Sequence, residues 1–308
     1  MPQWAGSSWY FLRYCDPKNE SAFAGMEALK YWMPVDWYNG GMEHVTRHMI
    51  YSRFWYRFLY DLGEVPYIEP YMKRSAVGLV LGADGQKMSK SLGNVVDPLD
   101  IAGAYGADTL RTYVCFMGDY GVASPWSDTG VKGAKRFLDR VAGMADLVRG
   151  TGSTPELESS FHKTVKKVSA DIEELKFNTA IAALMSLINE IYDAGTLTKD
   201  EMITFIKLLS PFAPHICEEI NEKLGEKGLL SLSKWPEYDE TKTIDKTVEI
   251  ALQVNGKLRG TLQIDADATK EDVLAAAKAD ARITAQTEGK TIVKEIYVPG
   301  KIVNIVIK

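Results

Sequence analysis

The strongest chemical signal in the sequence is a glycine-flanked loop that carries two lysines and two serines. It follows an apolar stretch and reads Gly82-Ala83-Asp84-Gly85-Gln86-Lys87-Met88-Ser89-Lys90-Ser91-Leu92-Gly93-Asn94. Ammonium groups and hydroxyls on such a loop suit the negative charges of a polyphosphate. The loop does not fit the Gly-x-x-x-x-Gly-Lys-Ser/Thr pattern of a Walker A loop. A solvated basic loop is the alternative interpretation.

A second candidate site has two histidines one helical turn apart, in the segment Tyr38-Asn39-Gly40-Gly41-Met42-Glu43-His44-x-x-x-His48. The two glycines let a ligand approach the backbone, and the start of a helix favours an anionic group. The pair could suggest a zinc site, but the sequence argues against it, because the order is not His-Glu-x-x-His and no cysteine lies nearby. Histidines packed on an aromatic core, and a surface Glu43–Arg47 salt bridge, are the plainer alternatives.

Residues 1–117, which must position both sites, have a mixed α/β pattern. Strands are predicted at 35–39 and 77–81, and a helix at 43–62. Within that helix the spacing of Tyr51, Phe54, Trp55 and Phe58 predicts one buried face. Of the 32 aromatic residues, 18 fall between Trp4 and Tyr71, which favours an aromatic core or a pocket for a planar or apolar ligand.

The middle of the chain, from 128 to 225, has a helical period almost throughout. One apolar stripe shows it most clearly: Ile181, Leu184, Met185, Ile188, Ile191 and Tyr192. Breaks are predicted at 150–155, at Gly195 and at 210–214. The pattern predicts an antiparallel helix bundle over residues 118–235.

The last segment, 247–308, is predicted to be a small α+β domain that follows a polar linker at 236–246. Alternating apolar residues flank Asn255-Gly256, which indicates a hairpin. A strict two-residue loop would place Val254 opposite Lys257, so we expect a longer loop that pairs Val254 with Leu258. A helix at 269–279 and strands at 291–298 and 302–307 complete the domain.

Composition sets broad limits on the class of protein. The 308 residues are 46% hydrophobic and 25% charged, which is typical of globular domains. Without a long apolar run or a signal-peptide pattern, we expect a cytoplasmic protein. The three cysteines are far apart and are expected to be free thiols. The net charge of the chain is −5. Residues 151–250 carry the excess of acid, with 11 basic and 18 acidic side chains, whereas residues 251–308 carry 9 basic and 7 acidic.

Several of these segments resemble class I aminoacyl-tRNA synthetases. Lys87-Met88-Ser89-Lys90-Ser91 is similar to the signature loop of that family, and the segments after it, 93–96 and 106–111, are also similar. The segment 6–14 and the Gly-Gly-x-Glu-His segment resemble the leucyl-tRNA synthetases within the family.

The resemblance implies roles for individual residues. Lys87 and Lys90 would be catalytic, neutralising charge on the leaving pyrophosphate while the amino-acid carboxylate attacks the α-phosphate of ATP. The ATP, with Mg²⁺ carried by it, would be bound by Lys87, Met88, Ser89, Lys90, Ser91, Glu43 and Gly41. The leucine and adenylate pocket would be formed by Trp4, Ser7, Tyr38, His44 and His48. Val77 departs from the family, which often has Gln there, so a contact of that Gln with the adenylate would be absent.

Resemblance extends over the rest of the chain. Segments 177–185 and 210–215 are similar to an anticodon-binding-type bundle, and core packing is the preferred interpretation of His215 and of the apolar stripe. Segment 254–260 resembles a small C-terminal domain that contacts tRNA. Lys257 and Arg259 are therefore expected to contact phosphates of tRNA(Leu), with solvated charges as the alternative. No metal site is expected.

Two features of the family are not found in the sequence. The His-Ile-Gly-His signature is missing, and so is any stretch that could form an editing insertion. We therefore expect a C-terminal portion of a leucine–tRNA ligase, with a partial Rossmann-like catalytic domain. It is expected to be inactive alone and to need the N-terminal half of the enzyme, as either a truncated product or one subunit of a split enzyme whose partner is an N-terminal synthetase subunit. An inactive tRNA-binding module is the alternative, and an unrelated ATP-dependent transferase is more remote.

Overall fold

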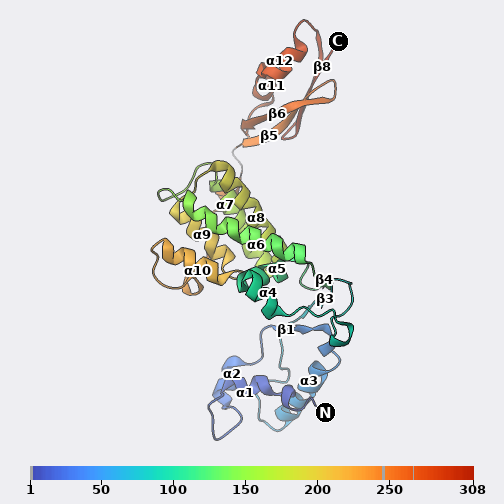
Figure 1. Ribbon diagram of the computed structural model, residues 1–308, viewed down its shortest axis with the longest axis vertical. Coiled ribbons are helices and arrows are strands. Elements are labelled where there is room, and N and C mark those ends of the chain that lie inside the picture. Colours follow the sequence, from blue (N-terminus) through green and yellow to red (C-terminus); the bar gives the residue numbers. More distant parts are fainter. Residues whose placement is uncertain (1–2, 245–246, 266) are drawn as a thin grey trace. The chain divides into compact units, whose positions relative to one another are not determined.

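The computed structural model describes residues 3–244, 247–265 and 267–308, in two compact units (Figure 1). One unit contains Met1–Thr154 and Thr164–Pro236, and the other contains Pro155–Lys163 and Glu237–Lys308. The division at 117, 235 and 246 that the sequence suggests stays a prediction. Each unit is described separately below. Within the described residues, no helix is both long and apolar enough to span a membrane.

The first unit begins with short helices and a small parallel sheet. The elements are η1 (Gly6–Ser8), α1 (Tyr10–Cys15), α2 (Met26–Trp32), β1 (Tyr38–Gly41), η2 (Met42–His44), α3 (His48–Asp61) and β2 (Arg74–Val77). Strand β1 pairs in parallel with β2, from Tyr38 opposite Arg74 to Gly41 opposite Val77. A compact apolar cluster supports them, in which Leu12, Leu29 and Tyr56 are fully buried.

Helix α3 differs from its prediction in where it begins and in which face it buries. It starts at His48 rather than at residue 43, because residues 42–44 form a separate 3-10 turn. Its buried residues are His48, Ser52 and Tyr56. Phe54 and Phe58, predicted to be buried, are 67% and 46% exposed, because no described element covers their side of the helix.

A second pair of parallel strands and two helices follow. They are β3 (Val80–Leu81), η3 (Lys90–Leu92), α4 (Pro98–Tyr105), α5 (Ala107–Phe116) and β4 (Ser124–Pro125), with β3 paired to β4. The predicted strand at 77–81 is thus divided between β2 and β3. A cluster around Tyr113 and Trp126 includes the partly buried Met88, which anchors the lysine loop to this core.

The helix bundle agrees closely with the sequence pattern. Its helices are α6 (Asp128–Gly143), α7 (Glu158–Glu173), α8 (Phe177–Ala194), α9 (Lys199–Leu209) and α10 (Pro214–Lys223), with short turns η4 (Met144–Leu147) and η5 (Leu230–Leu232). Of α7, residues from Thr164 onward belong to this unit. Helix α8 ends at Gly195 in the left-handed conformation, φ +67°, which a glycine adopts without a steric penalty. Along the predicted stripe, Ile181, Leu184, Ile188 and Ile191 are fully buried.

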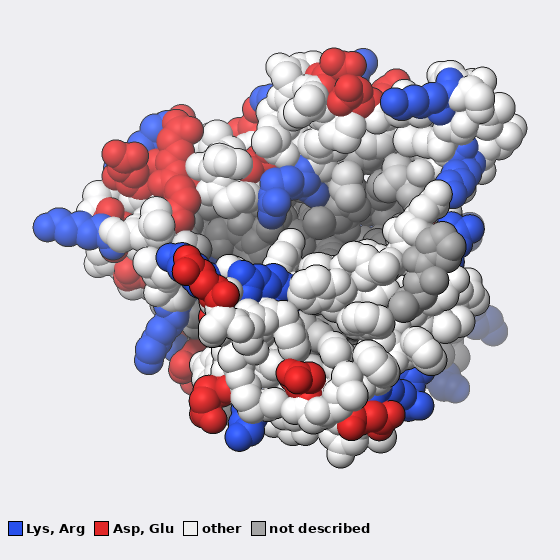
Figure 2. All heavy atoms as spheres, turned by 90° about the horizontal axis from the view of Figure 1, so that it is seen from below, with Lys and Arg blue, Asp and Glu red and all other residues white. Residues whose placement is uncertain are grey.

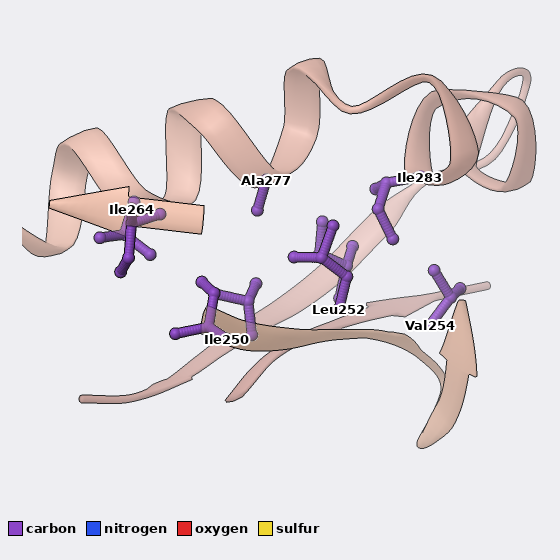
Figure 3. Packing of buried hydrophobic residues seen from close by; sticks show 9 residues of the cluster. Ile250, Leu252, Val254, Ile264, Ala277 and Ile283 are labelled. Carbon is purple, nitrogen blue, oxygen red and sulfur yellow. The ribbon is translucent and has the colours of Figure 1, made fainter. Parts of the chain in front are cut away.

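The second unit contains η6 (Glu240–Thr243) and a four-stranded sheet of order β6-β5-β8-β7. Its elements are β5 (Thr247–Val254), β6 (Lys257–Asp265), α11 (Lys270–Ala279), α12 (Ala281–Thr287), β7 (Ile292–Val298) and β8 (Ile302–Ile307). Figure 3 shows Ile250 and Leu252 of the sheet beneath Ala277 and Ile283 of the helices. The two predicted strands and the helix at 269–279 are confirmed, whereas α12 was not predicted.

The hairpin prediction was wrong about the loop. Val254 does pair with Lys257 across a two-residue Asn255-Gly256 turn. The register instead shifts after Leu252, which pairs with Gly260 while Gln253 pairs with Leu258, so one extra residue is accommodated as a bulge. The bulge brings Ile250 opposite Leu262 and leaves Leu258 62% exposed. The bulge in the strand therefore aligns the apolar residues of the two strands, and the turn keeps its two residues.

Candidate functional site

A pocket of about 260 Å³ opens where β1 and α3 meet the N-terminal segment. Its lining includes all five residues assigned to the leucine and adenylate pocket: Trp4, Ser7, Tyr38, His44 and His48. These residues come from positions up to 44 apart in the sequence. Their roles stay predictions, but the structure does bring the whole set to one cavity.

A chain of hydrogen bonds connects two tyrosines to a histidine in this pocket. The Tyr10 and Tyr38 hydroxyls lie 2.8 Å apart, and the Tyr38 hydroxyl lies 2.6 Å from Nε2 of His48. The Trp4 ring meets His44 edge to face, with 5.7 Å between ring centroids. The pocket therefore has an aromatic wall with polar groups at fixed positions, which suits an apolar ligand that carries polar ends.

Burial shifts the proton affinities of this hydrogen-bonded chain. Desolvation, and secondarily the nearby His44, lower the pKa of His48 below its ordinary value. Burial and the hydrogen bond to Tyr10 raise the pKa of Tyr38, so this hydroxyl stays protonated. Nδ1 of His44 and Nδ1 of His48 are buried and find no hydrogen-bond partner within the described residues. Such unpaired atoms are uncommon in protein interiors and often mark functional positions.

Gly41 and Glu43 stand beside this pocket, at the end of β1. A Cβ atom at Gly41 would overlap the carboxylate of Glu43, so a glycine at this position lets the carboxylate lie against the backbone. The Arg74 guanidinium donates to the Gly41 carbonyl at 2.9 Å. No Glu43–Arg47 ion pair is found in the part of the chain that the structure describes, so the simple salt-bridge alternative receives no support.

The lysine loop is held by one asparagine rather than by its own lysines. Asn94 Oδ1 accepts from the Ser89 backbone N–H at 2.8 Å, and its amide nitrogen donates to the Lys87 carbonyl and to Asp84. The Ser89 hydroxyl caps η3 by accepting from the Ser91 N–H. Lys87 and Lys90 are exposed, and neither has an ion-pair partner among the described residues. Two free ammonium groups on a braced loop suit a polyphosphate.

The remaining predicted residues lie elsewhere. Lys87, Met88, Ser89, Lys90 and Ser91 do not line the pocket of Trp4 and His48. Lys257 and Arg259 are exposed on β6 in the second unit. Val77 lines a different, smaller cavity of about 130 Å³ that also includes Cys115 and Phe177.

Sequence reasoning missed several residues of the site. Tyr10, Asn39, Met49 and Arg74 also line the pocket, and Asn94 braces the loop. Tyr10, Asn39 and Asn94 lie inside the segments singled out in the sequence, so a signal was present but not used. Arg74 had no local signal, because its proximity to Gly41 arises only from the pairing of β1 with β2.

The groups available fit a nucleotide better than a protein-bound metal ion. An exposed carboxylate beside a glycine backbone, and two free lysines on a braced loop, can bind ribose hydroxyls and phosphates. Among the described residues, no three His, Cys, Asp or Glu side chains come together to hold a metal ion. All three cysteines are free thiols, as expected.

Two family models match the chain. The model for class I tRNA synthetases (I, L, M and V) matches residues 19–127, and that for the anticodon-binding domain of tRNA ligase matches residues 155–274. A leucine–tRNA ligase from Alkaliphilus oremlandii is 57% identical over 309 residues, and one from Bdellovibrio bacteriovorus is 49% identical over 314. Both alignments cover 100% of this chain but only 38% and 39% of those relatives, so the chain spans well under half of their length.

Solved structures of aminoacyl-tRNA synthetases are also similar to this chain. A LeuRS–tRNA–LeuAMS ternary complex from Agrobacterium radiobacter K84 superposes with a TM-score of 0.73 at 32% identity, over 98% of this chain and 42% of that one. Methionyl-tRNA synthetase from Mycobacterium tuberculosis, in complex with methionyl-adenylate, has a TM-score of 0.56 at 17% identity, over 73% of this chain and 50% of that one, which shows a shared fold. The predicted fold class is confirmed by these matches. This chain is thus similar over its whole length to part of the leucine–tRNA ligases, and two of its segments match the models of the class I tRNA synthetases and of the anticodon-binding domain of tRNA ligase.

Proposed function

We propose that this chain forms part of a leucine–tRNA ligase, which activates leucine with ATP to leucyl-adenylate and transfers it to tRNA(Leu). The observation that carries the proposal is the convergence of Trp4, Ser7, Tyr38, His44 and His48 on one pocket. The close relationship to leucine–tRNA ligases supports the choice of leucine and of this tRNA as substrates.

In the proposed mechanism the pocket binds the amino acid and the adenylate. The aromatic wall around Trp4 and Tyr38 excludes water and selects the leucine side chain by shape. His48 is held by the Tyr38 hydroxyl, and its lowered pKa keeps the ring neutral at physiological pH, so it does not repel an ammonium group. Glu43 accepts hydrogen bonds from the ribose hydroxyls, with Gly41 leaving room for the sugar.

The lysine loop binds the other end of the nucleotide. Lys87, Ser89 and Ser91 contact the phosphates, while Met88 anchors the loop to the Trp126 cluster. Lys90 stabilises the charge that develops as pyrophosphate leaves, which is how preorganised cations accelerate such transfers. Any Mg²⁺ arrives bound to ATP, since oxygen-rich phosphates are its usual ligands.

Binding of tRNA is assigned to the other parts of the chain. The match of residues 155–274 to an anticodon-binding domain supports a tRNA-facing role for this part. Lys257 and Arg259 are exposed next to the hairpin turn, where phosphates of tRNA can reach them. We propose a cytoplasmic location, because protein synthesis takes place there.

The chain alone is proposed to be inactive. It spans 38% of the Alkaliphilus relative, so the rest of a catalytic domain must come from another polypeptide or from additional sequence. An N-terminal synthetase subunit would supply it. The test is leucine-dependent ATP–pyrophosphate exchange. The chain is coexpressed with the part of the Alkaliphilus leucine–tRNA ligase that does not align with it, and exchange is measured on the two together.

Lys90→Ala tests the catalytic role. The exchange rate should fall roughly 10²–10³-fold, because one charge-stabilising group in the transition state is lost. Lys132→Ala is a matched control, since it removes an equally exposed lysine from α6, outside the site. A Lys90→Ala variant as active as the control would contradict the role of the loop. Absence of exchange in every complemented sample, with tRNA binding intact, would favour the alternative of an inactive tRNA-binding module.

The double variant Lys257→Ala, Arg259→Ala tests the contact with tRNA. Affinity should drop at low salt, and the slope of log K against log salt should decrease by about 2, because two phosphate contacts are lost. Lys294→Ala with Lys301→Ala removes the same charge from other strands and loops of this unit. Equal losses in both double variants would mean that only net charge matters, and an unchanged affinity would exclude the contact.

A further inference from the structure

Helix α5 lies where α4 meets the helix bundle (Figure 1), and its faces have different partners. One face belongs to the apolar cluster of the lysine loop, in which Met88 is partly buried near Tyr113 and Trp126. The spacing of Leu110, Tyr113 and Met117 places these three side chains on that face. A second face carries two charged residues that contact the turn between α9 and α10.

Asp108, in the first turn of α5, supplies a cap that α10 lacks locally. Its carboxylate accepts from the Ile216 N–H at 2.8 Å and lies 2.7 Å from Nδ1 of His215. Ala213, the residue just before α10, has a methyl side chain and makes no capping hydrogen bond. A carboxylate at this end of a helix is favoured by the free N–H groups and by the helix dipole.

Arg111, three residues further along α5, contacts the other side of the same turn. Its guanidinium donates to the Pro211 carbonyl at 2.8 Å and to the Phe212 carbonyl at 3.2 Å. Both carbonyls lie in the turn that follows Leu209, the last residue of α9. An acidic side chain at the start of α10 and a basic one after the end of α9 thus hold the turn against α5.

The contacts of Asp108 differ from those of ordinary surface charges. Figure 2 shows Lys, Arg, Asp and Glu side chains of both signs scattered over the face that is seen there. Exposed pairs of this kind contribute little to stability, because water screens them. Asp108 is only 9% exposed, so loss of its carboxylate would leave the Ile216 N–H without its acceptor. The junction is therefore a specific contact between segments 108 positions apart.

We propose that Asp108 and Arg111 are positioning residues for the activation of leucine. They fix α5 against the α9–α10 turn, and α5 in turn sets the place of Lys90 when pyrophosphate leaves. Neither residue lines the pocket of Trp4 and His48, and neither belongs to the lysine loop. The inference rests on the proposed function and goes beyond it, because it gives a role in the reaction to residues that touch no substrate.

The lysine loop depends on α5 more than the leucine pocket does. The hydrogen bonds of Asn94 brace the loop internally, because their partners lie between residues 84 and 89. Met88 connects the loop to the cluster that contains α5. The leucine pocket is supported by a different apolar cluster, around Tyr56, to which α5 contributes no described residue. A shift of α5 should therefore move Lys90 and leave the leucine pocket in place.

A double-mutant cycle with Lys90 tests the proposal. Leucine-dependent ATP–pyrophosphate exchange is measured on the full chain coexpressed with the unmatched part of the Alkaliphilus relative. Asp108→Ala should lower kcat roughly tenfold and leave the KM for leucine unchanged, because a small displacement of a charge-stabilising group affects the transition state most. In a Lys90→Ala background the same substitution should lower kcat less than about twofold, since the group that it positions is already missing.

Two further variants separate positioning from general stability. Glu201→Ala is the matched control, because it also removes a buried carboxylate, whose hydrogen-bond partners Thr154 and Thr198 lie outside α5. It should lower the melting temperature, followed by circular dichroism, and leave kcat unchanged at a temperature where the protein is folded. Asp108→Asn keeps an acceptor for the Ile216 N–H and should restore most of the lost kcat.

Arg111→Ala decides the question if Asp108→Ala does not fold. The Arg111 side chain is exposed, so its truncation should leave the fold intact, and the same cycle with Lys90 applies. Its kcat should fall roughly 3–10-fold, because two carbonyl contacts of the turn are lost. Arg140→Ala is its control, since Arg140 donates to Asn189 within the bundle and does not contact the turn.

The outcomes tell failure of this inference from failure of the proposed function. Equal losses of kcat with and without the Lys90 side chain would overturn the positioning role, as would a kcat equal to that of the matched control. Both results leave exchange by the unmodified pair, and its loss in Lys90→Ala, unaffected. No exchange from the unmodified pair would instead overturn the proposed function, and the positioning role with it.

Discussion

Helices α3 and α8 have similar apolar patterns but opposite environments. Along α8, Leu184, Ile188 and Ile191 are fully buried between the neighbouring helices. Along α3, Phe54 is 67% and Phe58 46% exposed, while the less apolar side with His48 and Ser52 is buried. The apolar period of a helix therefore indicates which side needs a cover, but it does not say whether the same chain provides that cover.

The two regions also differ in how their polar groups are satisfied. In the bundle, the buried carboxylate of Glu201 accepts three hydrogen bonds, two from Thr154 and one from Thr198, so both of its oxygens have a donor. In the pocket beside α3, His44 and His48 each keep a buried nitrogen without a partner within the described residues. Buried polar groups are thus paired around Glu201 of the bundle, whereas two histidine nitrogens beside α3 are not paired within the described residues.

Leu184→Ala should have the largest effect on stability. This side chain is fully buried in α8, so truncation removes apolar contacts and leaves a cavity. We expect the free energy of unfolding to fall by about 2–5 kcal/mol, measured by urea denaturation. A loss below about 0.5 kcal/mol would mean that the bundle is not the tightly packed region we describe.

Glu201→Gln should have the next largest effect. The substitution keeps the size of the side chain but replaces one accepting oxygen with a donor that faces the N–H and hydroxyl donors of Thr154 or Thr198. Unfolding should become easier by about 1–3 kcal/mol, because a buried donor loses its acceptor. Asp200→Asn on the exposed side of the same turn is the control: its Oδ1 can still accept from the exposed Gly152 N–H, so its effect should stay within about 0.5 kcal/mol.

His48 should make stability depend on pH. Its pKa is lowered in the folded protein by desolvation and then by His44, so below about pH 6.5 the unfolded chain binds a proton that the folded chain does not. The free energy of unfolding should fall as the pH drops from that value toward the lowered pKa. His48→Gln should remove this component of the slope between pH 7 and pH 5, in urea titrations at several pH values. Identical slopes for both proteins would contradict the assignment.

Phe54→Ala should have the smallest effect, within about 0.5 kcal/mol for the chain alone, because two thirds of this side chain is already exposed. The result contrasts with that of Leu184→Ala, although the two substitutions look alike in the sequence. A loss of about 2 kcal/mol or more in the chain alone would show that Phe54 is covered by this chain after all.

Local rules predicted much of the fold. Gly195 and the two prolines of 210–214 end and begin helices where expected, since their backbone preferences act locally. The bulge after Leu252 escaped prediction, because apolar alignment can be restored either in the turn or in the strand. The exposure of Phe58 was equally unpredictable, since it depends on which elements the fold places beside α3 and not on the period of the helix itself.

The site was predictable in its residue types more than in its geometry. The glycines, lysines and histidines at the centre of the site lie in short motifs, and His44 and His48 do line one pocket with Trp4. Arg74 and Tyr10 were missed, because strand pairing and a hydrogen bond across 28 residues bring them there. Such long-range contacts leave no trace in local spacing.

Leucine-dependent ATP–pyrophosphate exchange tests the central claim most directly, because it asks whether this chain carries one part of an adenylation site. The chain alone and the unmatched part of the Alkaliphilus relative alone should each give no exchange above background. Together they should give exchange that requires leucine and is not supported by methionine. No exchange from the associated pair, or equal exchange from the chain alone, would contradict the account.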